Sequence, residues 1–218
     1  MNAPAGKSTE ALQPLSGRNV AADPELEIHV ASGAGSGPTR LAAFDAALCA
    51  VGVANYNLIR LSSVIPPGSV LNVSTVPLSP PGRWGDRLYL VLAEAHADVP
   101  GVQAHAGIGW IRDPALGRGL LVEHEGPSDA GVRADIEASL ASMRRGRGDA
   151  GDRLSDVQMV AQGVTCNDQP VCALVVAVFA AEPWHVSARP GPSDKLPLRG
   201  RQRLSHFPLN FGSGPRDR

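Results

Sequence analysis

The sequence predicts an α+β domain, and two observations lead to this prediction. Between residues 26 and 182 there are roughly eight segments with strand-like patterns but only two with a helical period. The strand segments also follow one another closely, whereas a doubly wound parallel sheet alternates each strand with a helix. A layered arrangement of strands and helices therefore fits the pattern better than a doubly wound sheet.

The two ends of the chain differ in composition from its middle. Residues 1–25 are polar and lack a period, so we expect a flexible N-terminal arm. Residues 26–182 are expected to form one domain, and residues 183–218, rich in proline, arginine and serine, a flexible C-terminal tail. Within the domain, the alternation of EIHVA predicts a first strand over 27–31, and the glycines of SGAGSGPT predict a loop over 32–39.

Two segments have the period and the end signals of helices. The first spans 40–52, where Thr39 is a suitable cap and Gly52 a natural stop. The second spans 128–145 and opens with the capping residue Ser128. Their expected apolar stripes are Leu41, Phe44, Leu48 and Val51 in the first helix, and Val132, Ile136, Leu140 and Met143 in the second.

The other ordered segments are expected to be strands. They cover 55–63, 70–75, 87–97, 102–111, 120–125, 156–164 and 171–181. The strands over 87–97 and 102–111 are separated by a connection of hairpin length. The last strand is apolar throughout, which predicts a central position with both faces covered.

Composition and charge narrow the class of function. The 20 basic and 21 acidic residues nearly cancel, so the overall charge favours neither nucleic acid nor an anionic membrane as a partner. The three cysteines have no metal-site spacing and are expected to be buried thiols. There is no apolar run of the ~20 residues that a spanning helix needs, and the N-terminus lacks a signal peptide's apolar core. We therefore expect a cytoplasmic protein that acts on a small molecule without a metal.

The sequence NLIRLSSVIPPG, residues 57–68, brings two serines to a constrained turn. An isolated Ser-Ser pair most often just ends a strand. A serine hydroxyl can, however, attack the carbonyl carbon of the preceding residue when that peptide is strained or polarised. Elimination from the resulting ester, followed by hydrolysis, leaves a pyruvoyl group at a new N-terminus. Ser62 and Ser63 are thus candidates for a self-cleavage site.

Three blocks of the sequence resemble the pyruvoyl-dependent arginine decarboxylase family. They are LAAFDAAL (41–48), NYNLIRLSSVIPPG (55–68) and LLVEHEG (120–126), in the family's order and spacing. The resemblance covers residues 27–181. It implies a four-layer αββα sandwich, cleavage between Ser62 and Ser63, and a trimer of cleaved units with active sites between neighbouring subunits.

The resemblance also implies roles for single residues. Ser63 becomes the pyruvoyl group, Asn57 assists cleavage, and Glu123 is the catalytic glutamate that returns a proton after carbon dioxide leaves. On the strand predicted over 55–63, Asn57 and Ser63 lie on one face, which agrees with a shared role. Glu125 points to the same side as Glu123, and only the family alignment distinguishes the two. A hydrolase triad through His124 is disfavoured, because His124 alternates away from Glu123.

The expected substrate site is formed by Asp45, Leu41 and Tyr56. In the family the position of Asp45 pairs with the substrate's guanidinium group, and a carboxylate suits a guanidinium group chemically. The chain departs from the family pattern at Ala42, Ala54 and Tyr56.

The expected function is decarboxylation of L-arginine to agmatine through an imine with the pyruvoyl group. No pyridoxal phosphate or metal is required. Two alternatives stay open: decarboxylation of another amino acid, and a non-catalytic homologue that serves as a binding or assembly module.

Overall fold

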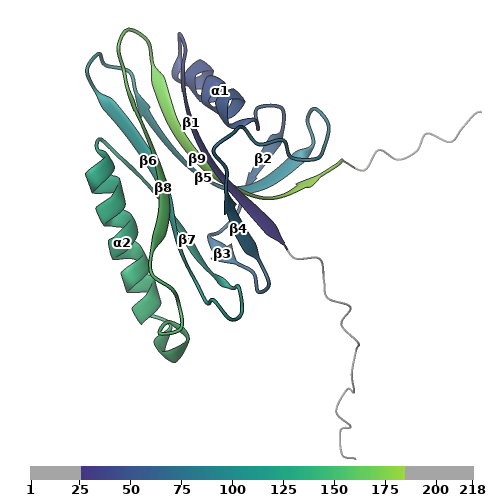
Figure 1. The fold of residues 1–218 in the computed structure, drawn as a ribbon. Helices are drawn as coiled ribbons and strands as arrows, with labels where there is room; N and C mark the ends of the chain where they lie inside the picture. The colour runs from purple at the N-terminus through teal and green to yellow at the C-terminus, as the bar shows by residue number, and fades with distance from the viewer. Residues whose placement is uncertain (1–25, 185–218) are drawn as a thin grey trace, which may run out of the picture. The chain divides into compact units, whose positions relative to one another are not determined.

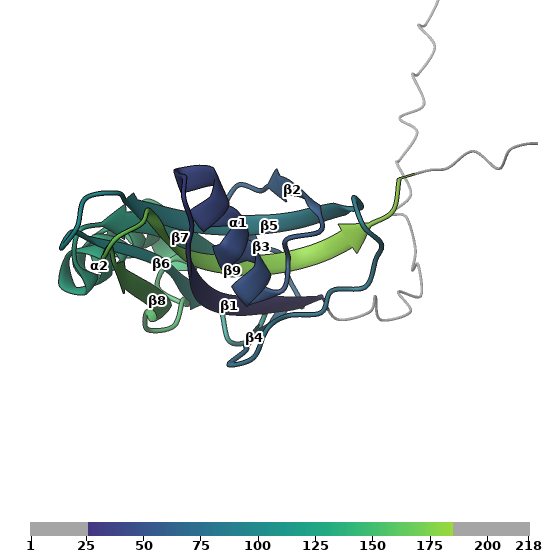
Figure 2. The same ribbon diagram turned by 90° about the horizontal axis from the view of Figure 1, so that it is seen from above.

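Two β-sheets and two α-helices make up residues 26–184, the part of the chain that the computed structural model describes (Figure 1). Sheet A contains, in order, β2 (Asn57–Arg60), β5 (Arg87–Ala97), β9 (Val171–Glu182), β1 (Glu27–Ser36) and β4 (Val70–Val73). Figure 2 shows this order from β2 at one margin to β4 at the other. Sheet B contains β3 (Val64–Ile65), β7 (Gly119–Gly126), β6 (Gln103–Arg112) and β8 (Gln158–Thr165). The predicted mixture of helices and strands is confirmed.

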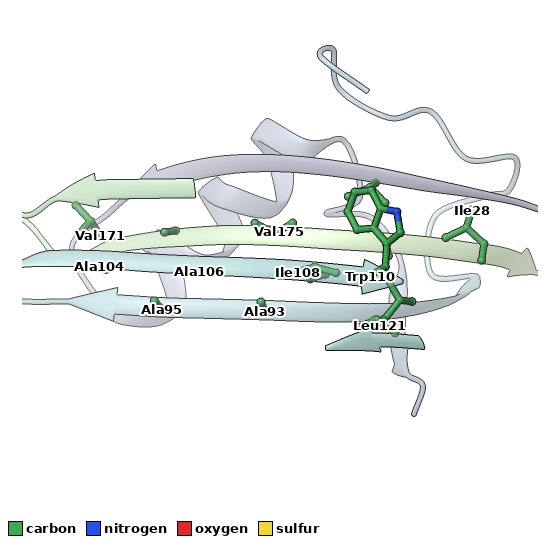
Figure 3. Close-up of a cluster of buried hydrophobic side chains, with 14 of the residues drawn as sticks. Ile28, Ala93, Ala95, Ala104, Ala106, Ile108, Trp110, Leu121, Val171 and Val175 are labelled. Carbon is green, nitrogen blue, oxygen red and sulfur yellow. The ribbon is translucent and has the colours of Figure 1, made fainter. Parts of the chain in front are cut away.

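The two sheets pack against each other through a core of mainly small side chains. At one end of this core, shown in Figure 3, Ala95 of β5 lies near Ala104 and Ala106 of β6. At the other end lie the larger side chains of Trp110 and Leu121. The indole nitrogen of Trp110 donates a hydrogen bond to Gln158 at 2.9 Å, so its one polar atom is satisfied.

Each helix packs on the outer face of one sheet. The helix α1 (Arg40–Val51) packs on β1 and β9, where the second apolar cluster includes Leu174 and Val176. The helix α2 (Asp129–Arg145) packs on β6 and β7 through Val132, Ile136 and Leu140, as its period predicts. A short 3₁₀ turn, Gly148–Ala150, follows α2. Ser128 caps α2 by accepting a hydrogen bond from the Gly131 amide at 3.2 Å.

The ends of α1 are as predicted, and so is the burial of Leu48 and Val51, but Leu41 and Phe44 do not lie on the buried face. The Thr39 hydroxyl accepts from the Ala42 amide at 3.1 Å, and Gly52 ends the helix at φ 88°. The buried side chains are Ala43, Ala47, Leu48 and Val51, whereas Leu41 is 75% exposed and Phe44 half-buried. Small residues face the sheet because the glycines of β1 let the helix backbone approach closely.

Several strand predictions are corrected by the pairing. The segment predicted as a loop over 32–39 is strand as far as Ser36, because β1 pairs with β9 from His29 to Ser36. The strands β5 and β6 do not form a hairpin; they lie in different sheets and face each other through their alanines. By contrast, β9 is central between β5 and β1, as its unbroken apolar sequence predicts.

The cysteine prediction holds for two of the three thiols. Cys166 and Cys172 are buried, but Cys49 is exposed on α1. Burial raises the pKa of Cys172 to about 12, with a smaller contribution from the negative charge of Glu94. That thiol therefore stays protonated, and unreactive, near neutral pH.

Two further findings concern the described part of the chain. Neither of its helices is long and apolar enough to cross a bilayer. Between residues 26 and 184, no group of three His, Cys, Asp or Glu side chains is placed to hold a metal ion.

Candidate active site

Residues 61–63 carry the chain from the edge of sheet A to the edge of sheet B. The strand β2 pairs in parallel with β5, and this pairing ends where the Leu61 amide donates to the Leu90 carbonyl at 2.9 Å. Two residues later, the Ser63 carbonyl accepts from the Leu121 amide of β7 at 2.9 Å. The strand predicted over 55–63 is therefore too long: only Asn57–Arg60 is strand, at the edge of sheet A, and β3 begins at Val64 in sheet B.

The peptide between Ser62 and Ser63 lies in a tight three-residue turn. The Ser62 carbonyl accepts a hydrogen bond from the Val64 amide at 2.8 Å, which closes the turn around Ser63. A donor on a carbonyl oxygen polarises the carbonyl and stabilises negative charge that develops there. The carbonyl that self-cleavage would attack is thus already hydrogen-bonded.

The Ser63 hydroxyl donates a hydrogen bond to Oε2 of Glu123 at 2.7 Å. This length is typical of a hydroxyl bound to a carboxylate. Glu123 lies on β7 and shares the face of Leu121, which contacts the inter-sheet core. A hydroxyl nucleophile and a proton acceptor are thus in direct contact, which is the arrangement that activates a serine.

The turn after the serines is tied down at several points. The Ser69 hydroxyl donates to the Pro66 carbonyl at 2.8 Å, and the Gly68 amide donates to the Leu116 carbonyl at 2.9 Å. The Arg112 guanidinium donates to the Ser69 carbonyl. Because Pro66 and Pro67 have no amide hydrogen, β3 cannot continue beyond Ile65. The segment that follows Ser63 is held at both of its ends.

A cavity of about 300 Å³ opens beside Glu123. Its lining residues come from β2, β5 and β7: Arg60, Leu92, Ala93, Glu94, Glu123, His124 and Glu125. Arg60 pairs with Glu94 at 2.9 Å across the β2–β5 edge. The His124 ring bonds to Ser139 of α2 at 2.8 Å and not to Ser63, so the disfavoured triad is absent here.

The structure does not bring Asn57 to Ser63. The Asn57 side-chain amide donates to the Gly85 carbonyl, and the indole of Trp184 donates to the same carbonyl at 2.8 Å. The argument that Asn57 and Ser63 share a strand face is wrong, because β2 ends at Arg60 and the chain then changes sheets.

The three predicted substrate residues also lie apart from Ser63 within one chain. Tyr56 is half-buried beneath the loop after β4, where its hydroxyl donates to the Pro80 carbonyl at 2.7 Å. Leu41 and Asp45 are exposed on α1, which Figure 1 places toward the top of the molecule, with β3 toward the bottom. Of the predicted site residues, Ser62, Ser63 and Glu123 are together.

Sequence reasoning missed two features of the site. The Val64 amide, which holds the Ser62 carbonyl, has no signal in the sequence because any residue but proline supplies an amide. The Arg60–Glu94 pair joins residues 34 positions apart and depends on the register of β2 against β5. Of this pair, only Arg60 belongs to the sequence block around Ser63.

These residues fit a pyruvoyl group. Its precursor must be a serine whose hydroxyl is close to a proton acceptor and whose preceding carbonyl is polarised. Ser63 meets the first condition through Glu123, and Ser62 meets the second through the Val64 amide.

Comparison with known proteins agrees with this chemistry. The family model for pyruvoyl-dependent arginine decarboxylase matches residues 27–183. The chain is similar to proteins of that name from three organisms. The Halobacterium salinarum protein is 48% identical over 92 residues, which are 41% of this chain and 56% of the relative. The Thermococcus kodakarensis protein is 31% identical over 146 residues, 66% of this chain and 87% of the relative.

The Pyrococcus abyssi protein is 30% identical over 157 residues, which are 72% of this chain and 95% of the relative. The match thus spans just over half of the Halobacterium protein but nearly all of the Pyrococcus protein. The family model covers the whole described domain, from β1 to β9, including both serines and Glu123. The chain therefore belongs to the pyruvoyl-dependent arginine decarboxylase family.

Proposed function

We propose that this protein is a self-processing pyruvoyl-dependent decarboxylase that converts L-arginine to agmatine and carbon dioxide. Residues 26–182 form its catalytic domain, flanked by the segments 1–25 and 183–218. The observation that carries the proposal is the 2.7 Å hydrogen bond from the Ser63 hydroxyl to Glu123, next to a Ser62 carbonyl held by the Val64 amide. The cytoplasmic location stays a prediction of the sequence.

Self-cleavage starts from this arrangement. The Ser63 oxygen bonds to the Ser62 carbonyl carbon while Glu123 accepts its proton, and the Val64 amide stabilises the charge on the carbonyl oxygen. The bond between that carbon and the Ser63 nitrogen then breaks, and the nitrogen takes up a proton. The α carbon of residue 63 then loses its proton as the bond from its β carbon to the ester oxygen breaks, which releases the Ser62 carboxylate and leaves dehydroalanine. The imine tautomer of dehydroalanine adds water and releases ammonia. The products are a chain of residues 1–62 and a chain that begins at position 63.

Glu123 has a second task in the decarboxylation. The pyruvoyl group supplies an electrophilic carbonyl that accepts the substrate amine and withdraws electrons as carbon dioxide leaves. Glu123 lines the cavity beside position 63 and is the ionisable side chain in contact with it. It is therefore placed to return a proton to the substrate carbon.

The remaining predicted residues fit a site shared between subunits. Leu41 and Asp45 are exposed on α1 and make no contact with Ser63 in their own chain, so we assign them to the cavity of a neighbouring subunit in a trimer. Tyr56 and Asn57 hold the loop after β4, which we place at the margin of that shared site. Helices on the outer faces of two packed sheets support a four-layer αββα sandwich.

The alternative functions differ in what they require of Ser63. A non-catalytic module has no use for the bond between Ser63 and Glu123, which therefore favours an enzyme. Another amino-acid substrate requires the same bond, so carbon dioxide release across a panel of amino acids distinguishes it.

Intact mass measurement of the purified protein tests the self-cleavage. We expect wild type to yield fragments 1–62 and 63–218, the larger without a free amino terminus. Ser63→Ala removes the nucleophile and is expected to stay one chain without activity. Ser62→Ala keeps the Ser63 hydroxyl and is the matched control, which should still cleave. Cleavage of Ser63→Ala would refute the role of Ser63.

A further inference from the structure

Arg60 is the one permanently charged cation among the residues that line the cavity beside Glu123. The other charged lining residues are Glu94, Glu123 and Glu125, so the walls carry three carboxyl groups and one guanidinium group. The His124 ring, which also lines the cavity, is hydrogen-bonded to α2. Of these lining residues, only Arg60 would attract a further carboxylate released into the cavity, because like charges repel.

The side chain of Arg60 extends in the direction of the peptide between the two serines. The strands β2 and β5 run parallel with Arg60 opposite Leu90, and the guanidinium group donates at 2.9 Å to Glu94, further along β5. The chain runs the same way at Leu61, whose amide bonds to the Leu90 carbonyl. Two residues of extended chain span about 7 Å, and an extended arginine side chain about 6 Å. The guanidinium group can therefore reach the carboxyl group of Ser62.

Arg60 has hydrogen-bonding capacity to spare. Among residues 26–184 its side chain bonds only to Glu94, through one nitrogen, whereas a guanidinium group carries five N–H donors. The Arg60 side chain is 58% exposed, and ion pairs as exposed as this one add little stability. Stabilisation of the edge of sheet A is therefore a weak explanation for the pair.

We propose that Arg60 binds the carboxylate of Ser62 as it leaves residue 63, and so speeds the elimination that leads to the pyruvoyl group. This inference rests on the proposed self-processing function. It assigns Arg60 to the maturation of the protein and leaves the charged end of the substrate with Asp45.

The step takes place in the ester, where the acyl group of Ser62 is bonded to the side-chain oxygen of residue 63. The bond from the β carbon to that oxygen breaks, and its electron pair leaves with the Ser62 carboxylate. The α-carbon proton passes to Glu123, which has by then given its first proton to the nitrogen released by the acyl shift. A cation next to the departing oxygens stabilises the negative charge that they acquire.

Hydroxylamine trapping in a time course of intact mass measures the ester directly. Hydroxylamine cuts the ester so that fragment 1–62 ends in a hydroxamate, whereas elimination leaves that fragment with a carboxylate. Loss of a charge-assisted contact predicts that elimination in Arg60→Gln is about 10- to 100-fold slower than in wild type. The ester should then accumulate, and the hydroxamate should predominate. Arg60→Lys keeps a cation and should yield mainly the carboxylate.

Glu94→Gln separates the cation from the ion pair. This change and Arg60→Gln both remove the pair, but only Glu94→Gln keeps the positive charge. We expect Glu94→Gln to accumulate no ester. The matched control is Arg40→Gln, because Arg40 is similarly exposed and also forms a 2.9 Å pair, with Asp98. It should behave as wild type.

The outcomes separate this inference from the proposed function. Ester accumulation in Arg60→Gln but not in Glu94→Gln supports the inference. Absence of the hydroxamate in Arg60→Gln overturns it, whether the carboxylate forms at the wild-type rate or more slowly. Equal accumulation in Glu94→Gln overturns it too, because the ion pair would then be responsible. A wild type that stays one chain and forms no ester refutes the self-processing function itself.

Circular dichroism checks that each variant is folded. If Arg60→Gln is not folded, Arg60→Met replaces it, because methionine is a long, unbranched and uncharged side chain. This variant must accumulate the ester in the same way, and its failure to do so overturns the inference.

Discussion

At the scale of single residues, the carboxyl group of Glu123 is the candidate for proton transfer in two reactions, self-cleavage and decarboxylation. Ser63 and Glu123 are 60 positions apart in the chain, and their contact joins the end of the inter-sheet crossover to β7. In the proposed self-cleavage Glu123 would accept the proton of the Ser63 hydroxyl. In decarboxylation it would return a proton at the same place. Both roles need a group that exchanges protons, and a hydrogen-bond acceptor alone does not suffice.

Glu123→Gln separates proton transfer from hydrogen bonding. The amide oxygen still accepts a hydrogen bond from Ser63, but the side chain neither takes up nor releases a proton. We expect slower self-cleavage in a time course of intact mass. Carbon dioxide release per cleaved chain should fall about 10²- to 10⁴-fold, the usual contribution of a positioned acid or base. Glu137→Gln serves as the control, and wild-type rates in Glu123→Gln would contradict both roles.

At the scale of elements, the close contact between α1 and β1 sets the position of the helix that carries Leu41 and Asp45. A Cβ atom added at Gly35 would overlap backbone atoms of Ala43 and Ala47 in α1. The glycines that looked like a loop signal are therefore in a strand, directly beneath a helix. Their function is to leave room for the helix backbone, as glycines in strands often do where another backbone approaches.

Gly35→Ala is expected to push α1 away from sheet A. Overpacking of a tight contact typically costs about 1–3 kcal/mol of the free energy of unfolding. Urea denaturation of the uncleaved Ser63→Ala protein measures this cost on a single chain. Gly126→Ala is the control, because its added Cβ would meet only the Val132 side chain, at 3.5 Å. Equal midpoints for the two variants would show that the close approach is unimportant for stability.

At the scale of the whole molecule, the proposed cut between Ser62 and Ser63 falls where the chain changes sheets. The fragment before it contains β1, α1 and β2, all of which belong to or cover sheet A. In that sheet β1 lies between β9 and β4, and its pairing with β9 runs from His29 to Ser36. The fragment after the cut supplies all four strands of sheet B and the rest of sheet A. Each fragment alone would therefore leave an apolar core open.

We expect the two fragments to remain associated after cleavage. They should elute together in size-exclusion chromatography and separate only in denaturant, because β1 and α1 are packed into the core of sheet A. Refolding after denaturation should fail for the cleaved protein and succeed for Ser63→Ala, whose chain is continuous. Loss of fragment 1–62 during native chromatography would contradict this expectation.

The sequence alone determined the features that depend on neighbouring residues. The ends of α1 at Thr39 and Gly52, the cap of α2 at Ser128 and the central position of β9 follow from short patterns. The candidates Ser63 and Glu123 came from the sequence blocks named above, and the structure brings their side chains into contact.

Only the tertiary structure decided which strands pair. It ended the strand predicted over 55–63 at Arg60, placed β5 and β6 in different layers, and turned the Asn57 side chain toward the Gly85 carbonyl. The physical reason is that an alternating pattern shows which faces of a strand are apolar but not which distant edge will pair with it. That choice depends on the packing of both sheets at once, and here it also produced the cavity beside Glu123.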